Sequence, residues 1–117
     1  MKRFFLSFLD ILYIHNDVIA DTGGAKGIRD RAGIESAVAL QQAIFLGQEL
    51  YPTVAEKSAM LCFELVTQHP FMDGNKRVGH GAMIDFLHMN GFILEADDDE
   101  QFEIIIKLAS GELEKDT

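Results

Sequence analysis

The stretch HPFMDGNKR, from His69 to Arg77, lies between two long apolar segments of a chain of 117 residues. Pro70 cannot continue a helix that precedes it, and Gly74 permits a tight turn before a helix that follows. We therefore expect this stretch to connect two central helices, over 54–69 and 75–90. Its nine residues also carry a histidine, a carboxylate, an amide and two cations. The loop is thus a candidate site as well as a turn.

Apolar residues recur at helical spacing along most of the chain. Besides the two central helices, the pattern predicts helices over 8–21, 31–46 and 99–109, with Phe45 on the inward face of the second. We find no linker or internal repeat, which indicates one domain over 1–117. The predicted class is all-α, with five to six helices around a central antiparallel pair joined by the HPFMDGNKR loop.

Local signals support these helix positions. Ser7 with Asp10 and Thr53 with Glu56 have the spacing of capping boxes, and Asp30 is a candidate N-cap. Small residues at the start of the helix over 75–90 would permit close approach to a neighbouring helix; they are Gly79, Gly81 and Ala82.

Composition narrows the classes of function. The formal charge is −9 with ten Lys and Arg, which argues against a general nucleic-acid binder and favours a protein partner with basic patches. The one cysteine, Cys62, lies in an apolar run, so we expect a buried, inert thiol in a cytoplasmic protein. No stretch reaches the roughly 20 apolar residues of a membrane span, and Asp10 interrupts the apolar N-terminal run, so we expect no membrane association.

The start of the helix after the loop is a candidate anion site. A helix N-terminus presents unpaired N–H groups and a positive dipole end, so the amides of residues 74–77 would face an anion. Gly74 would allow the backbone to approach that ligand closely. Lys76 and Arg77 fall in the first turn, where cations oppose the dipole unless an anion lies in front of them, which favours a phosphate. Asn75 could cap the helix or donate its amide to a phosphate, and both roles stay open.

Asp73 and His69 flank this site, and each has two interpretations. Asp73 could be the N-cap of the helix, or it could hold Mg²⁺ through one carboxylate together with substrate phosphates. His69 could be a dipole partner at the end of the preceding helix, or a general base, since imidazole titrates near neutrality. Phe71 is expected in the core, where it would anchor the loop.

The remaining histidines are weaker candidates. His80 lies one turn beyond Arg77 and could reach a phosphate, although a structural hydrogen bond is its commoner role. We expect a similar structural role for His15, and a solvated or dipole-stabilised position for His88. The spacing of these histidines along the sequence does not match that of zinc ligands.

The stretch HPFMDGNKR resembles the active-site motif of the Fic/Doc family, HPFx(D/E)GN(G/K)R, and matches it at every defined position. Other segments resemble the death-on-curing (Doc) branch of the family in the same order along the chain. They are Ile14-His15, GGAKGIRD at 23–30, ESA at 35–37, Tyr51-Pro52 and Asn90-Gly91. The resemblance covers nearly the whole chain and implies an all-helical Fic fold.

The resemblance also implies an activity, the transfer of part of a nucleotide to a protein hydroxyl. It implies that His69 deprotonates the target Ser or Thr and that Asp73 holds Mg²⁺. Asn75 and Arg77 would bind phosphates, and Lys76 and Arg77 would stabilise the transition state. ATP would be the substrate.

Two positions depart from the AMP-transferring members, which usually carry GNGR followed by a second arginine three residues later. Lys76 and His80 occupy these positions. Doc-like proteins share the GNK form and resemble kinases, so we expect a toxin kinase that transfers the ATP γ-phosphate to a target of the elongation factor Tu type and arrests translation. A Fic-type AMP transferase using the same residues is an alternative. A catalytically silent helical adaptor is another.

Regulation is expected to come from a second protein. Many Fic proteins carry an inhibitory (S/T)xxxE(G/N) helix, and this sequence contains no such segment. The resemblance to Doc implies a Phd-like antitoxin as partner. It also implies a target-docking flap in the segment 47–53.

Overall fold

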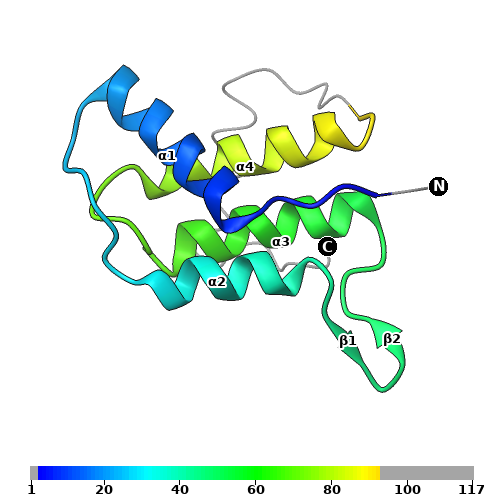
Figure 1. Ribbon diagram of the computed structural model, residues 1–117. Coiled ribbons are helices and arrows are strands. Elements are labelled where there is room, and N and C mark those ends of the chain that lie inside the picture. Colours follow the sequence, from blue (N-terminus) through cyan, green and yellow to red (C-terminus); the bar gives the residue numbers. More distant parts are fainter. Residues whose placement is uncertain (1–2, 93–117) are drawn as a thin grey trace.

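Four helices and one short hairpin make up the part of the chain that a computed structural model describes, residues 3–92. In chain order the elements are α1 (Phe8–Thr22), α2 (Arg31–Leu40), β1 (Ile44–Phe45), β2 (Gln48–Glu49), α3 (Val54–Thr67) and α4 (Asn75–Met89). Figure 1 shows α3 and α4 running side by side in opposite directions, and α2 lying along α3. The predicted central antiparallel pair is confirmed.

Each helix packs against two others, so that the four close a ring. α1 contacts α4 and α2, while α3 contacts α4 and α2, and the contact between α3 and α4 is the most extensive. The main core fills the space inside this ring. Its largest fully buried side chains are those of Ile11, Ile34, Met60, Leu61, Leu65, Phe71, Val78 and Phe86.

Side chains cap three of the four helices as the sequence predicts. Ser7 and Asp10 form a complete capping box, in which each side chain accepts from the other's backbone N–H. Asp30 accepts from the N–H of Gly33 at the start of α2. At the start of α3, the half of the predicted capping box in which Thr53 accepts from the N–H of Glu56 is present, at 3.0 Å.

The predicted helix over 31–46 is wrong beyond Leu40, because contacts with distant segments redirect the chain. Gln41 is fully buried, and its amide accepts from the N–H of Leu6 at 2.9 Å and donates to the carbonyl of Leu6 at 2.8 Å. The ammonium of Lys57, on α3, donates to the Gln41 carbonyl. Gln41 is therefore held at the end of α2 by two contacts, one from its carbonyl to α3 and one from its side chain to Leu6.

A β-hairpin follows where the helix was expected to continue. Its turn residues Leu46 and Gly47 have φ of 52° and 81°, a left-handed pair that suits a two-residue hairpin and that a right-handed helix excludes. The strands pair in antiparallel register, Ile44 with Glu49 and Phe45 with Gln48. Phe45 is 64% exposed, so the prediction that it faces the core is wrong.

The all-helical class is confirmed, with four helices in residues 3–92 where five to six were expected for the whole chain. The helix predicted over 99–109 lies outside the described residues. Burial raises the pKa of the Cys62 thiol to about 12, which agrees with an inert cysteine. Within residues 3–92 there is no helix with both the length and the apolar character needed to cross a membrane.

Gly79 sets the distance between the two central helices. A Cβ atom there would lie 2.6 Å from Cγ2 of Val66 and 3.1 Å from the carbonyl of Cys62. A Cβ at Gly81, by comparison, would meet Cγ2 of Ile14 alone, at 2.9 Å. The close approach of α4 to α3 therefore depends on the missing side chain at Gly79.

We predict that Gly79→Ala lowers the free energy of unfolding by about 1–2 kcal/mol. Overpacking of a core typically costs 1–3 kcal/mol, and the upper part of this range, about 2–3 kcal/mol, applies because a new Cβ would meet both a buried side chain and a backbone carbonyl. Alanine gains roughly 0.8–1 kcal/mol over glycine in helix propensity, which offsets part of this cost. Urea denaturation measures the change, with Gly81→Ala as the matched helical control and a smaller expected loss. A Gly79→Ala protein as stable as the wild type would contradict the close packing of α3 on α4.

Candidate active site

The loop between α3 and α4 is fixed at Phe71. The Phe71 side chain is 1% exposed, and its ring stacks on the His15 ring of α1 with centroids 3.9 Å apart and planes 7° apart. Nε2 of His15 lies 3.0 Å from the carbonyl oxygen of Asp73, to which it donates when it carries the proton. One histidine of α1 thus contacts two residues of the loop, and its role here is structural.

Asn75 closes the loop on itself. Its Oδ1 accepts from the N–H of Phe71 at 2.9 Å, and its Nδ2 donates to the carbonyl of Phe71 at 3.0 Å. Of the two roles considered from the sequence, capping α4 is therefore wrong, because the side chain is turned back toward Phe71. An amide nitrogen carries two hydrogens, so one N–H of Asn75 has no partner within residues 3–92 and could reach an anion.

The N-terminus of α4 carries no side-chain cap, in contrast to those of α1, α2 and α3. Its N-cap is Gly74, whose φ of 81° is left-handed. A side chain at this position would place its Cβ 3.1 Å from Cγ1 of Val18. The first backbone bond of the helix runs from the N–H of Val78 to the carbonyl of Gly74, which leaves the preceding amides directed away from the helix.

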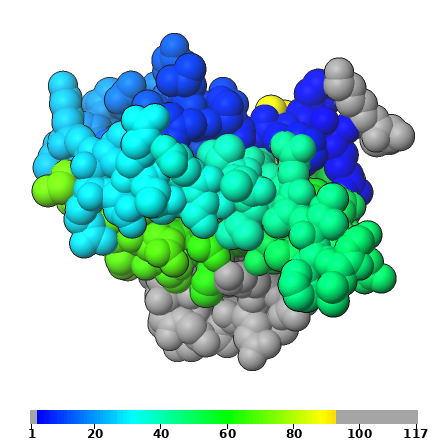
Figure 2. Space-filling view, turned by 60° about the horizontal axis from the view of Figure 1, so that its bottom comes forward, coloured from blue at the N-terminus to red at the C-terminus, as the bar shows by residue number. Residues whose placement is uncertain are grey.

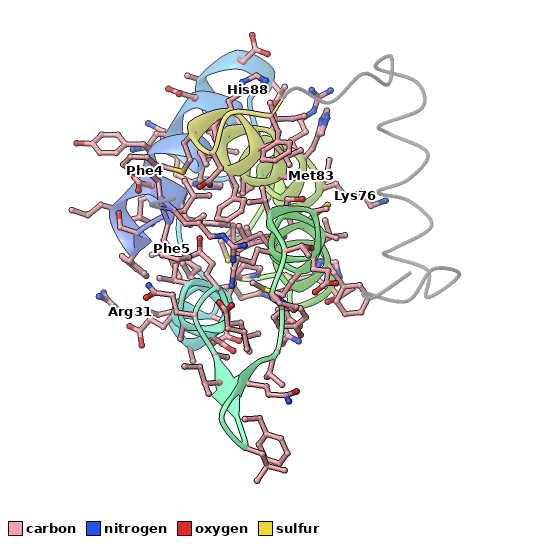
Figure 3. All side chains as sticks on the ribbon, turned by 90° about the vertical axis from the view of Figure 1, so that its right-hand side faces the viewer. Phe4, Phe5, Arg31, Lys76, Met83 and His88 are labelled. Carbon is pink, nitrogen blue, oxygen red and sulfur yellow. The ribbon has the colours of Figure 1, made fainter. Side chains whose placement is uncertain are left out.

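Positive side chains surround this open helix end. The first turn contains no acidic residue, and Lys76 and Arg77 are both exposed. Figure 3 shows the Lys76 side chain extending away from the body of the protein. Free amides, the positive end of the dipole and two cations together can hold an anion such as a phosphate.

Asp73 presents an exposed carboxylate directly before the turn at Gly74. Its Oδ2 accepts from the N–H of Ala25 at 2.7 Å, so the carboxylate is oriented by the loop after α1 and does not cap α4. Among residues 3–92, no three His, Cys, Asp or Glu side chains gather into a metal site. One oriented carboxylate beside an anion site nevertheless fits Mg²⁺, which often takes its other ligands from water and substrate phosphates.

His69 lies on the other side of the loop. α3 ends at Thr67, two residues earlier than predicted, so His69 is outside the helix. It is exposed, and its φ of 49° is left-handed, which is uncommon for a residue other than glycine. Its imidazole makes no hydrogen bond or ion pair within residues 3–92 and is available to a substrate.

Arg77 and His80 line a cavity of about 440 Å³ between α1 and α4, together with Asp17, Asp21 and Asp85. Burial raises the pKa of the Asp85 carboxyl; His88 opposes this shift, and the negative charges of Asp17 and Asp10 add to it. Arg77 therefore borders an acidic groove, and it belongs to the first turn of α4. His69 and Asp73 lie outside this cavity.

A family model described as the Fic/DOC family matches residues 5–87. The chain belongs to the Fic/DOC family. It is also similar to a protein named Toxin Doc from Mycolicibacterium smegmatis, with 42% identity over 77 residues. That match covers 66% of this chain and 59% of the relative, so the chain spans about three-fifths of the length of this curated relative. The family expected from the motif is thereby confirmed.

The candidate site has a second component whose role was not predicted from the sequence, the loop over residues 23–30. Ala25 orients Asp73, and a Cβ at Gly24 would lie 3.3 Å from that carboxylate. Figure 2 shows the light-blue atoms of this loop beside yellow-green atoms of the α3–α4 connection. The sequence marks this loop only through GGAKGIRD at 23–30, a segment that resembles the Doc branch, and such a resemblance does not indicate which other segment the loop contacts.

We predict that Asn75→Ala lowers the free energy of unfolding by about 1–2 kcal/mol, because it removes two hydrogen bonds to the Phe71 backbone. Urea denaturation checks the value, and hydrogen exchange of the Phe71 amide should become faster. Asn16→Ala, at an exposed position of α1, is the control and should change stability by less than about 0.5 kcal/mol. Equal urea midpoints for the Asn75→Ala and Asn16→Ala proteins would contradict the stabilising role of the two hydrogen bonds between Asn75 and Phe71.

Proposed function

We propose that this protein is a Doc-like toxin kinase, which transfers the γ-phosphate of ATP to a Ser or Thr hydroxyl of a protein target. The Fic/DOC family is one of protein-modifying transferases, and the chain is similar to a relative named as a toxin. The observation that carries the proposal is the uncapped N-terminus of α4 with Lys76 and Arg77 exposed around it. Such a helix end is suited to a nucleotide phosphate.

His69 acts as the general base in this proposal. Its imidazole accepts the proton of the target hydroxyl, and the hydroxyl oxygen forms a bond to the γ-phosphorus as the bond from that phosphorus to the β–γ bridging oxygen breaks. The products are a phosphorylated Ser or Thr and ADP. The exposed imidazole, with no partner within residues 3–92, is compatible with approach of a hydroxyl from another protein.

The phosphates of ATP lie against the amides of residues 74–77 in the proposal, with Asn75 donating its second amide hydrogen. Arg77 and Lys76 balance the charge that spreads over the phosphoryl oxygens in the transition state. Asp73 would hold Mg²⁺ together with phosphate oxygens, and the ion would supply further positive charge there. The support for these phosphate-binding and metal-binding roles is that all four side chains belong to the connection between α3 and α4 or to the first turn of α4.

Lys76 favours phosphate transfer over AMP transfer. The exposed lysine in the first turn of α4 occupies the position at which AMP-transferring relatives usually have a glycine that leaves room for the outer phosphates. A long cation there changes which phosphates fit and suits an ATP that presents its γ-phosphate to His69. The same residues would support AMP transfer if the nucleotide were bound in the opposite direction.

The target and the inhibitor are proposed by class. The target is a translation factor of the elongation factor Tu type, whose modification would arrest protein synthesis in the cytoplasm. The inhibitor is a separate Phd-like antitoxin. The charge of −9 is compatible with such a partner if the partner carries basic patches.

We predict that incubation of the protein with translation extract, Mg²⁺ and ATP labelled at the γ position transfers label to a protein, whereas ATP labelled at the α position does not. His69→Ala should lower the transfer rate about 100-fold or more, as expected for loss of a general base. His88→Ala, an exposed histidine near the end of α4, should transfer at the wild-type rate. Label appearing from the α position alone would overturn the kinase proposal in favour of AMP transfer. Growth arrest that persists unchanged in His69→Ala would favour a silent adaptor.

A further inference from the structure

Residues 25–30 run antiparallel to residues 68–73 and pair with them along their length. Ala25 donates to the Asp73 carboxylate, Met72 donates its N–H to the carbonyl of Gly27 at 3.1 Å, and Ile28 forms an isolated bridge with Phe71. The loop after α1 therefore supports the whole connection between α3 and α4.

Arg29 makes the hydrogen bonds at the end of this pairing that lies nearest to His69. Its Nε donates to the carbonyl of His69 at 2.9 Å, and its guanidinium NH2 group donates to the carbonyl of Gln68 at 3.3 Å. Its backbone N–H donates to the carbonyl of Pro70 at 2.7 Å, and the N–H of Asp30 donates to the same oxygen at 2.9 Å. Three successive carbonyls are thus held by Arg29 and its neighbour.

These bonds bear on the unusual backbone of His69. The first residues after a helix often adopt left-handed φ, and glycine is the residue that does so without steric cost. Here the left-handed residue is His69, with φ of 49°, followed directly by Pro70, which brings no N–H to the turn. A conformation of this kind persists when surrounding contacts impose it, and the contacts on the peptide of His69 come from the Arg29 guanidinium.

We propose that Arg29 is a positioning residue, whose guanidinium holds the His69 backbone so that the imidazole faces the transferred phosphoryl group. The inference rests on the proposed role of His69 as base. The anion site does not depend on this contact, because residues 71–75 are held by His15 and by Asn75. Loss of the guanidinium should therefore slow the transfer step and leave nucleotide binding intact.

Arg29→Met keeps the approximate length of the side chain but removes its N–H donors, and it leaves the backbone bonds between residues 25–30 and 68–73 in place. We expect kcat for γ-phosphate transfer to fall about 10- to 100-fold, since a displacement of about 1 Å at a reacting group can cost a factor of 100, with KM for ATP within about two-fold of wild type. Arg29→Lys, which retains one donor, should be intermediate. Added guanidinium ion should restore part of the rate of Arg29→Ala.

Arg31→Met is the matched control, because Arg31 lies two residues away, pairs with Glu35 at 2.7 Å on the surface of α2 and stacks on the Phe8 ring of α1. It should transfer phosphate at the wild-type rate. An Arg29→Met protein with wild-type kcat, or one whose KM for ATP rises while kcat is unchanged, would overturn the inference.

A second readout separates this inference from the proposed function. Backbone chemical shifts of His69, measured by NMR, should report positive φ in the wild type and in Arg31→Met, and loss of positive φ in Arg29→Met. Retention of positive φ in Arg29→Met would overturn the inference whatever the enzyme transfers. Equal transfer by the wild type and by His69→Ala would instead refute the base, which is a failure of the proposed function.

Discussion

The burial of Phe71 is the constraint on which the arrangement of the site depends. Its ring stacks on His15, its N–H and carbonyl are both bonded to Asn75, and its strand-like backbone is bridged to Ile28. Because the ring of Phe71 and both sides of its backbone are held, the polar residues before and after it lie at set positions on the surface. His69 and Asp73 are separated by this buried residue and reach solvent on either side of it.

Much of the fold follows from local sequence signals. The caps at Ser7, Asp30 and Thr53 form as expected, since each depends on residues three positions apart. The prediction failed after Leu40, where the structure is decided by Gln41 meeting Leu6, 35 residues away. Helical periodicity continues through Phe45 in the sequence and cannot report such a contact.

The candidate site was predictable to a similar extent. The nine residues of the motif indicate an anion site, because cations in a first helical turn are unfavourable without one. The part that escaped prediction is the support by residues 25–30, which includes the Arg29 contact with His69 across 40 residues. Asn75 is a second example of a contact that the sequence could not predict. From the sequence alone its amide could cap α4 or bind a phosphate, and the position of Phe71 decides that it bonds to the loop itself.

In the proposed function, the open N-terminus of α4 and its two cations bind the phosphates of ATP, and the direction in which ATP lies selects the reaction. A crystal structure of the protein with a non-hydrolysable ATP analogue and Mg²⁺ tests this proposal most directly. We expect triphosphate density along the amides of residues 74–77, with the γ-phosphorus as the phosphorus nearest to the His69 imidazole. An α-phosphorus nearest to His69, with the outer phosphates directed away from it past Lys76, would contradict the kinase proposal.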